Sequence, residues 1–557
     1  MPARFNSKNA GMKPALLMVI IIKYGIIYAI TNRNIMNQYL EKLIWLHEER
    51  EEKRHINEDK IQVNEFVGKM ASIYEKMRNS FDFKDAHILR KNAIHRMLKR
   101  HFFLSNDSNK IARYLASELV RGGYLPNNSV TDSKVESIAK IVAKYLLIKE
   151  GIAFKVVKKN EINKWLIEMA SCEIDEEVVP PELDEALVDV MFQEMSRRVK
   201  LANIKIKEKE YNIQLYIAVL RAIRKLDKSL IEYNLLKFYS PKWRDYGREN
   251  IKAIVNKIDY AKELIQTKAK SPIADRFYSA VKKQVPPYRI IKEIIEQDPK
   301  EAREIFSNEE KREETIQIIT KSKYKTTRSK LARGAIRAII YVLLTKIFLA
   351  VLIEMPYEFF VLKEYNYFAL GVNILFHPIL LFFLAITASL PREKNTLALI
   401  ERIGQILNSD YRELEQIRIK ISRPSAKRSV FNFFYLLITL GFFALIVWGL
   451  ISVGFNVVSI ILFVVFLCVV SFLGIRVRNI AKEYKINTGK IGALRALVDF
   501  LALPIVRTGK LLTMNFSRIN VFVMFLDIAF EAPFKLILQY MDEWLSFLRE
   551  KRDEISD

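Results

Sequence analysis

Three polar residues lie inside long apolar runs of the sequence and are the first candidates for chemistry. Lys346 belongs to the run 335–353, and Asn373 and His377 belong to the run 367–389. At 1.5 Å per helical residue, Lys346 and Asn373 would lie about 10 Å from one end of their runs, with His377 one turn deeper. A lysine beside a histidine could bind an anion or relay a proton. We expect the first two apolar helices to bring these three residues together.

A structural interpretation of the same residues stays open. Lys346 could extend its ammonium group toward Glu354 or Glu358, and Asn373 could join two helices by hydrogen bonds. Transporters usually carry an inverted repeat or a series of charges within their spans, and this sequence has neither. We therefore place the structural interpretation first and transport second.

The remaining candidates give no catalytic, cofactor or metal site. Five of the six histidines fall within 55 residues, but neighbouring members are at least six residues apart, so no two share a helix face as in HExxH. The Gly-Lys pairs at 489–490 and 509–510 lack the other residues of a phosphate-binding loop and are expected to be turns. We expect no metal, no cofactor and no enzyme activity. The histidines concerned are His47, His55, His87, His95 and His101.

Four apolar runs dominate the region between residues 335 and 476. Each is close to the roughly 20 residues that a helix needs to cross a hydrocarbon core of about 30 Å. Charged or turn-like segments separate the runs. The sequence predicts a four-helix transmembrane block with spans at 335–353, 367–389, 431–451 and 455–475.

Basic residues flank these runs unevenly. The segments 321–334, 391–430 and 476–490 are rich in Lys and Arg, whereas the connection 354–366 is mostly acidic. Because positively charged flanks stay inside, we predict a multi-pass protein of the cytoplasmic membrane with both termini in the cytoplasm. The basic residues expected to contact anionic lipids of the bilayer are Lys321, Lys323, Lys325, Arg328, Lys330, Arg333, Arg476 and Arg478.

The amino-acid composition indicates what kind of structure accompanies the membrane block. The chain of 557 residues is 50% apolar yet 27% charged, and its formal net charge is +26. That charged fraction requires a large water-exposed portion beside the spans. Glycine and proline are scarce, with 17 and 16 residues, and helix-forming residues dominate. We therefore expect an all-α protein in which a cytoplasmic multi-helix domain is joined to the transmembrane block.

Composition shifts and prolines divide the chain further. The apolar segment 15–30 is short and contains Lys23, so we expect an interfacial or buried helix, with a span or signal peptide as the alternative. An acidic stretch with two prolines is expected to be a linker. An amphipathic helix is expected at about 396–422. The divisions are 1–33, a helical subdomain at 34–172, the linker at 173–184, a second subdomain at 185–330, the block at 335–476, and membrane-lying amphipathic helices in 477–557.

The helix expected at 88–103 has a strongly basic face. Such a face could bind nucleic acid, with Phe102 and Phe103 available for stacking. A solvated face attracted to anionic lipid is the preferred interpretation, because the protein is held at a membrane. Nucleic acid is therefore the less favoured partner.

Three short segments carry a family resemblance. They are Glu354-Met355-Pro356-Tyr357-Glu358, Ile519-Asn520-Val521-Phe522 and Glu531-Ala532-Pro533-Phe534-Lys535. In these the chain resembles a family of uncharacterised helical membrane proteins from uncultured small-genome bacteria. The resemblance implies the same layout over most of the chain and no activity or site.

Together these features predict a membrane scaffold or assembly protein. Its basic helical domain would present a surface to a protein partner at the cytoplasmic face of the membrane. The alternative is a channel or transporter component that uses Lys346, Asn373 and His377, and a membrane enzyme comes third.

Overall fold

A computed structural model gives the fold of the chain, and it is all-α, as the sequence predicts. The structure describes residues 44–45, 59–79, 85–102, 105–153, 159–203, 206–244, 251–364, 366–388, 390–408, 416–420, 426–486, 493–518 and 532–556. The apolar segment 15–30 and the histidines His47 and His55 lie outside these residues.

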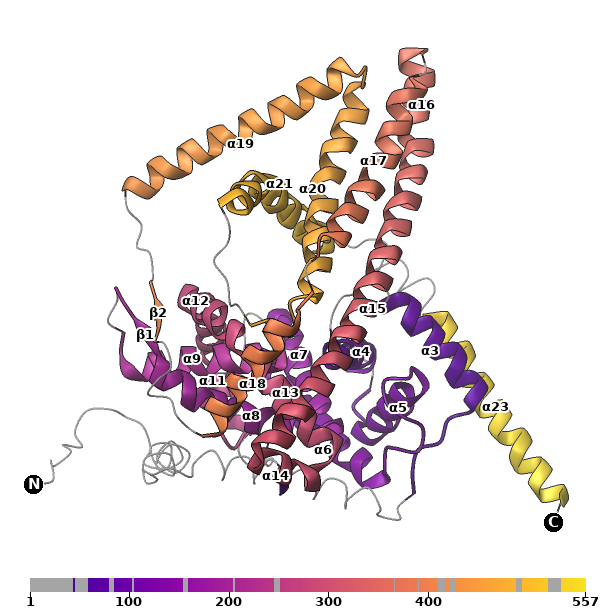
Figure 1. The fold of residues 1–557 in the computed structure, drawn as a ribbon. Helices are drawn as coiled ribbons and strands as arrows, with labels where there is room; N and C mark the ends of the chain where they lie inside the picture. The colour runs from indigo at the N-terminus through magenta and orange to yellow at the C-terminus, as the bar shows by residue number, and fades with distance from the viewer. Residues whose placement is uncertain are drawn as a thin grey trace, which may run out of the picture.

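Two groups of helices make up the molecule, a broad helical body and a set of long helices that rise from it (Figure 1). The helices of the body are α3 (Glu65–Asn79), α4 (Ala86–His101), α5 (Ser108–Arg121), α6 (Asp132–Ala153), α7 (Lys159–Val178), α8 (Glu182–Arg198), α9 (Glu208–Arg224), α10 (Lys228–Tyr239), α11 (Ile251–Ala269), α12 (Pro272–Val281), α13 (Pro286–Gln297), α14 (Pro299–Ser307) and α18 (Glu393–Leu407). The other elements are the strands β1 (Val199–Leu201) and β2 (Ile417–Ile419) and the helices α15 (Glu309–Leu349), α16 (Met355–Tyr357), α17 (Tyr367–Ile386), α19 (Ala426–Ser452), α20 (Val457–Ile480), α21 (Ala493–Arg518) and α23 (Ala532–Ser556).

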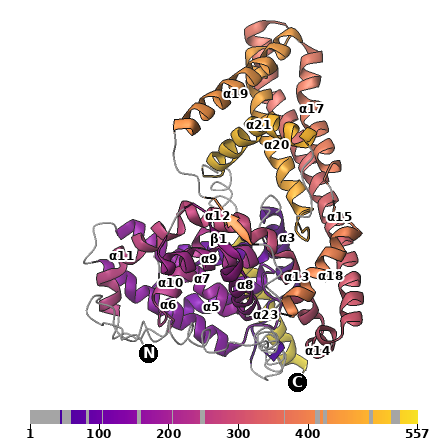
Figure 2. The ribbon, with the colours of Figure 1, turned by 60° about the vertical axis from the view of Figure 1, so that its left-hand side comes forward.

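One hydrophobic core extends through the body. It includes buried side chains from Ile44 to Ile319, and it also includes Leu399, Ile403 and Ile419 from the connection between the second and third apolar runs. Tyr484 and Ile486, beyond the fourth run, pack against the same core. Segments before, between and after the apolar runs therefore lie on one side of the long helices, as Figure 2 shows from a second direction.

The expected linker at 173–184 is wrong. Residues 173–178 form the last turns of α7, and after the two prolines α8 begins at Glu182. Glu173, Asp175 and Glu176 are buried there. An acidic stretch can be buried when basic side chains of other helices compensate its charges, so the two expected subdomains are parts of one body.

Glu176 has the largest set of basic partners in that stretch. Its carboxylate accepts hydrogen bonds from Arg224 at 3.0 Å, Lys237 at 2.6 Å and Arg244 at 2.7 Å. Burial alone would raise the pKa of Glu176, but the nearby charges of Lys237, Arg224 and Arg244 lower it below its ordinary value. The neighbouring Asp175 pairs with Arg90, yet burial raises its pKa to about 6.

The segment between the second and third apolar runs belongs to the body. The helix expected at about 396–422 is wrong in its second half, since α18 ends at Leu407 and residues 417–419 form β2. This strand pairs in parallel with β1, with Val199 opposite Ile417. Arg402 of α18 also forms an ion pair with the buried Glu194 of α8. Through these contacts, α18 and β2 are part of the body.

The long helix α15 connects the body to the apolar region. It continues past Leu349 through π-helical turns and α16 as far as Leu362, giving 54 helical residues in an uninterrupted run. At 1.5 Å per residue such a helix is about 80 Å long. The connection expected at 354–366 is therefore mostly helical, and the π-helical turns lie on both sides of Pro356, which cannot donate a backbone hydrogen bond.

Among the residues that the structure describes, four helices are long and apolar enough to cross a membrane, which confirms a multi-pass membrane protein. They are Glu309–Leu362, Tyr367–Ile386, Ser429–Ser452 and Val457–Ile480. Helices α15, α17 and α20 pack together, whereas α19 inclines away from α20 beyond the turn that joins them (Figure 1). Gly454 in that turn has a φ of +85°, which glycine adopts without strain.

Helix α21 packs along α20 at a position that only glycine permits. A Cβ on Gly509 would lie 1.9 Å from the backbone carbonyl oxygen of Cys468. The pair Gly509-Lys510 is thus in the interior of a helix and not in the expected turn. Small residues at such points let two helix backbones approach closely.

We expect Gly509→Ala to destabilise the protein by about 1 to 3 kcal/mol, because the added methyl group must push α21 away from α20. Gly441→Ala is the matched control. A Cβ there meets nothing within 4 Å, so the helix propensity of alanine would stabilise α19 by up to about 1 kcal/mol. Unfolding in mixed detergent micelles measures both, and equal effects at the two positions would contradict the close approach.

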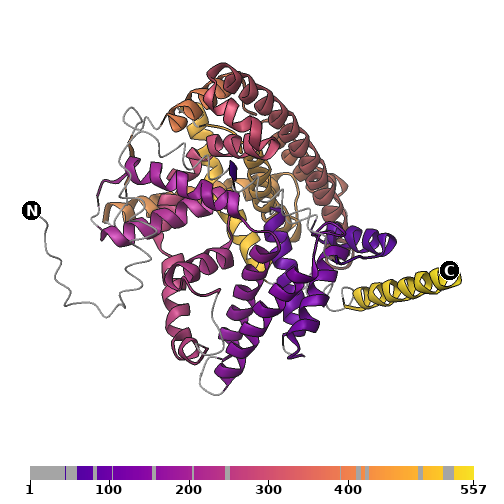
Figure 3. The same ribbon diagram turned by 90° about the horizontal axis from the view of Figure 1, so that it is seen from below.

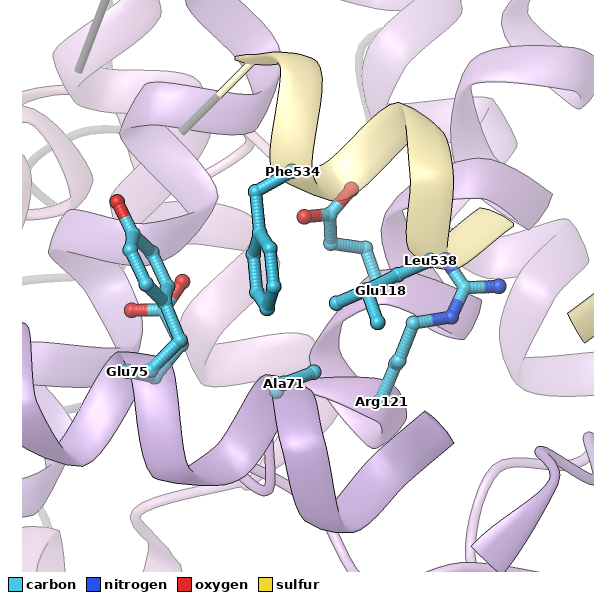
Figure 4. A pocket seen from close by; sticks show the side chains of 8 residues that line it. Ala71, Glu75, Glu118, Arg121, Phe534 and Leu538 are labelled. Carbon is cyan, nitrogen blue, oxygen red and sulfur yellow. The ribbon is translucent and has the colours of Figure 1, made fainter. Parts of the chain in front are cut away.

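The C-terminal helix α23 docks on the body and projects from its side, as the view from below shows (Figure 3). Its Phe534 ring lies 5.1 Å from the ring of Tyr74 on α3, and Leu538 packs with Val67 and Ala71. Figure 4 shows Phe534 and Leu538 pointing into the pocket beside Ala71. That pocket has a volume of only about 10 Å³, so it is a helix-docking site and not a ligand site.

Candidate intramembrane polar site

One face of α15 is buried along its whole apolar length. The buried residues recur every three or four positions, which is the spacing of a single helix face. That face contacts α17 and α20. The half nearer the body, which we call the inner half, is apolar, and the half farther from the body, the outer half, is mostly polar. Leu331, Ala335, Ala338 and Val342 are followed by Lys346, Ala350, Glu354 and Glu358.

The polar half forms a chain of hydrogen bonds that starts at Lys346, whose side chain is 1% exposed. Its Nζ donates to Oδ1 of Asn373 at 2.6 Å and lies 4.6 Å from the centre of the Phe466 ring. The Asn373 amide donates in turn to Oε1 of Glu354 at 2.7 Å, and Ser459 donates to Oε2 at 3.3 Å. The asparagine thus separates a buried ammonium from a buried carboxylate and bonds to both.

Glu358 extends the chain one turn farther out. Asn456, the N-cap of α20, donates to its Oε1 at 2.9 Å. Its other carboxylate oxygen is buried and has no hydrogen-bond partner among the described residues. The chain of hydrogen bonds thus contains one ammonium group, that of Lys346, and two carboxyl groups.

His377 lies one turn deeper than Asn373 on α17. Its Nδ1 is 3.2 Å from the carbonyl oxygen of Asn373, and its Nε2 is 3.0 Å from the carbonyl oxygen of Phe463. A neutral imidazole can donate only one of these hydrogen bonds, whereas an imidazolium donates both. The imidazole therefore lies between the backbones of α17 and α20 and joins the two helices.

Seven residues belong to this chain, which we call the polar ladder. It covers only the outer part of the membrane block. Farther in, Val342 packs against Leu381 and Val470, and below these Ala335 packs against Val477. These apolar layers separate the ladder from the body. The ladder consists of Lys346, Glu354, Glu358, Asn373, His377, Asn456 and Ser459.

The structure thus brings together the three residues that the sequence singled out and the two carboxylates, Glu354 and Glu358, that the structural interpretation names as possible partners of Lys346. The sequence places Glu354 and Glu358 in the connection 354–366, because the apolar run stops at residue 353. Their four-residue spacing from Lys346 through Ala350 is the signal that places them on the same helix face. Asn456 and Ser459 enter the ladder only because α20 packs beside α15, which no local pattern predicts.

The basic residues predicted to contact lipid lie between the body and the apolar layers. Those on α15 are exposed, except that Lys323 is partly buried and paired with Glu293. Arg476 and Arg478 flank Val477, which packs against Ala335 at the same level. Lipid contact by these residues stays a prediction.

The basic helix α4 does not present a free basic face. Four of its five arginine and lysine side chains pair with carboxylates from elsewhere in the body, and Lys99 is exposed. The pairs are Arg90 with Asp175, Lys91 with Asp227, Arg96 with Glu75 and Arg100 with Glu118. The expected exposed surface for lipid or nucleic acid is therefore largely absent on α4. Burial, followed by the charges of Lys91 and its basic neighbours, lowers the pKa of His95 to about 4.

No group of three His, Cys, Asp or Glu side chains that could hold a metal ion occurs within the described ranges. Comparison with protein-family models, curated proteins and solved structures gives no match to the chain. The body and the polar ladder are therefore the features of the molecule that indicate its function.

Proposed function

We propose that this protein is a membrane-anchored scaffold or assembly factor whose helical body holds a protein partner at the cytoplasmic face of the membrane. The observation that carries the proposal is the shared core. Chain segments from before the first span, between the second and third, and after the fourth are packed into one body, which α15 enters without a break. Such a body keeps a fixed position relative to the bilayer.

The body lies in the cytoplasm in this proposal. The shared core supports it because two helical hairpins return the chain to the same side each time. The basic residues between the body and the apolar layers support the choice of side, since positive flanks remain inside. In this orientation the chain before the first span and the chain after the fourth span both lie on the cytoplasmic side of the membrane.

Cysteine labelling tests this orientation with little background, because Cys172 and Cys468 are both buried. In intact cells a membrane-impermeant maleimide should label Glu364→Cys, just beyond the long helical run that ends at Leu362. It should label Lys325→Cys only after the membrane is permeabilised. Both native residues are exposed, so accessibility depends on the side of the membrane. The reverse pattern would place the body outside.

Photo-crosslinking tests the scaffold role. Tyr260 and Ile318 are large exposed apolar residues of the body, 69% and 62% exposed. Benzoylphenylalanine at these positions in the full-length protein should give discrete protein adducts in cells that naturally contain it. The matched control is the same group at Trp448 of α19, where lipid adducts are expected. A body without protein adducts at either position would contradict the proposal.

A second candidate function is a channel or transporter component, and Glu358 favours it. A buried carboxylate oxygen with no hydrogen-bond partner in the described part of the chain, at the end of a hydrogen-bonded ladder, is an arrangement for accepting a proton. The apolar layers of Val342, Leu381 and Val470 oppose it, because passage through the block would require these helices to separate. The ladder is therefore the secondary candidate.

Liposomes that contain the purified protein distinguish the two functions. Transport through the ladder should give proton or ion flux that Lys346→Met abolishes, while Lys325→Met on the exposed side of α15 leaves it unchanged. The absence of flux from the wild-type protein under a membrane potential would remove the second candidate.

A further inference from the structure

A cleft lies where the body meets the inner end of the first span. It is bounded by α3, α4, the turn after α5 and α15, and its volume is about 450 Å³. That volume is within the range of small-molecule sites, whereas the pocket under α23 has room for a single water. We call it the juxtamembrane cleft.

The chemistry of the cleft favours an anion. Its acidic residue, Glu75, already accepts hydrogen bonds from Arg96 at 2.9 Å and Tyr124 at 2.7 Å, and Asn79 donates to the Tyr124 hydroxyl at 2.8 Å. Lys76 and Arg337 also line the cleft. Both are exposed and neither forms an ion pair with another described residue. Their charges are therefore available to a ligand, and phosphate is a common partner of such a pair.

The position of the cleft identifies the source of that phosphate. Arg337 is two residues beyond the start of the first apolar run, at the level where the lipid surface is expected. Outward from it, exposed apolar residues continue along the same face of α15 at helical spacing, which is a path suited to an acyl chain. They are Ile340, Tyr341, Leu344 and Phe348.

We propose that the juxtamembrane cleft binds one anionic phospholipid. Lys76 and Arg337 hold the phosphate, and the acyl chains lie along Tyr341 and Leu344. Leu89 of α4 and Gly334 of α15 also line the cleft, so the lipid would join the body to the span. This inference depends on the membrane placement proposed above and is independent of the scaffold role.

Native mass spectrometry of the full-length protein in detergent tests the proposal. Phosphatidylglycerol should bind in a one-to-one complex, and phosphatidylcholine should bind at least tenfold more weakly. Lys76→Gln combined with Arg337→Gln should weaken phosphatidylglycerol binding about tenfold or more, as expected for two cations near the surface. The matched control, Lys252→Gln with Lys257→Gln, removes two exposed cations of α11 outside the cleft and should change binding by less than twofold.

Three results would overturn the proposal. Equal weakening by the control pair would indicate diffuse attraction to basic residues. Competition by glycerol phosphate as effective as that by the long-chain lipid would indicate a soluble phosphate ligand. Equal binding of both lipids would remove the role of charge. Because Lys76 and Arg337 are exposed, the unfolding temperature of the cleft variant should match that of the wild type, and the cysteine labelling separately tests the membrane placement.

Discussion

Replacement of Glu176 by glutamine is expected to destabilise the body by about 3 to 5 kcal/mol, the scale measured when one partner of a buried ion pair is removed. The glutamine leaves the charges of Arg224, Lys237 and Arg244 without their shared carboxylate. The Arg224 side chain is only 5% exposed, so solvent cannot replace the lost partner. Tryptophan fluorescence during thermal or urea unfolding in mild detergent reports the loss, because Trp165 and Trp243 are buried in the same body.

The effect of Glu176 should depend on pH in a defined direction. Its pKa in the folded protein is below the ordinary value of 4.5. The stability that it contributes is therefore fully present above about pH 4.5 and is lost as the pH falls through the lower folded value. The difference between wild type and Glu176→Gln should shrink correspondingly in acid. Glu177→Gln, at the partly buried neighbouring position, is the control and should change stability by about 0.5 kcal/mol or less.

The second large effect is expected in the polar ladder. Lys346→Met leaves the Glu354 carboxylate buried without its cation, and Glu354→Gln leaves the ammonium without its anion. Each single replacement should cost about 3 kcal/mol or more. The double variant removes both charges and should cost much less than the sum of the two. Unfolding of the three variants in mixtures of mild detergent and dodecyl sulfate measures this coupling.

Lys325→Met provides the control for the ladder, since Lys325 is exposed on the same helix. Its expected effect is within about 0.5 kcal/mol. Additive costs for Lys346→Met and Glu354→Gln would mean that Asn373 does not connect their charges. In that case the hydrogen bonds of the ladder would join the helices independently, and the charges of Lys346 and Glu354 would have no coupling free energy.

Much of the membrane block can be predicted from the sequence because its signal is local. A run of about 20 apolar residues has few alternatives to a spanning helix, and the spacing of Asn373 and His377 places them on one face. The outer boundary of the first span is harder to predict from the sequence. Glu354 and Glu358 resemble loop residues, and only the polar groups of the adjacent helices show how they are accommodated.

The body is less predictable because its charges are satisfied across long sequence separations. Asp175 pairs with Arg90, and Glu194 pairs with Arg402. An acidic stretch with two prolines has the composition of a linker, and nothing within it identifies partners that far away. The pairing of β1 with β2 is non-local in the same way, since three-residue strands carry almost no signal of their own.

The contribution of α18 and β2 to the core of the body also determines the order in which the protein can mature. These segments are synthesised only after the first two spans. Helices α3 to α14 therefore emerge from the ribosome before the residues that complete their packing, and the first helical hairpin must enter the bilayer before Leu399 and Ile403 can reach the body. Folding of the body is thus coupled to membrane insertion, and a polypeptide arrested before insertion exposes an unfinished apolar surface to cellular quality control.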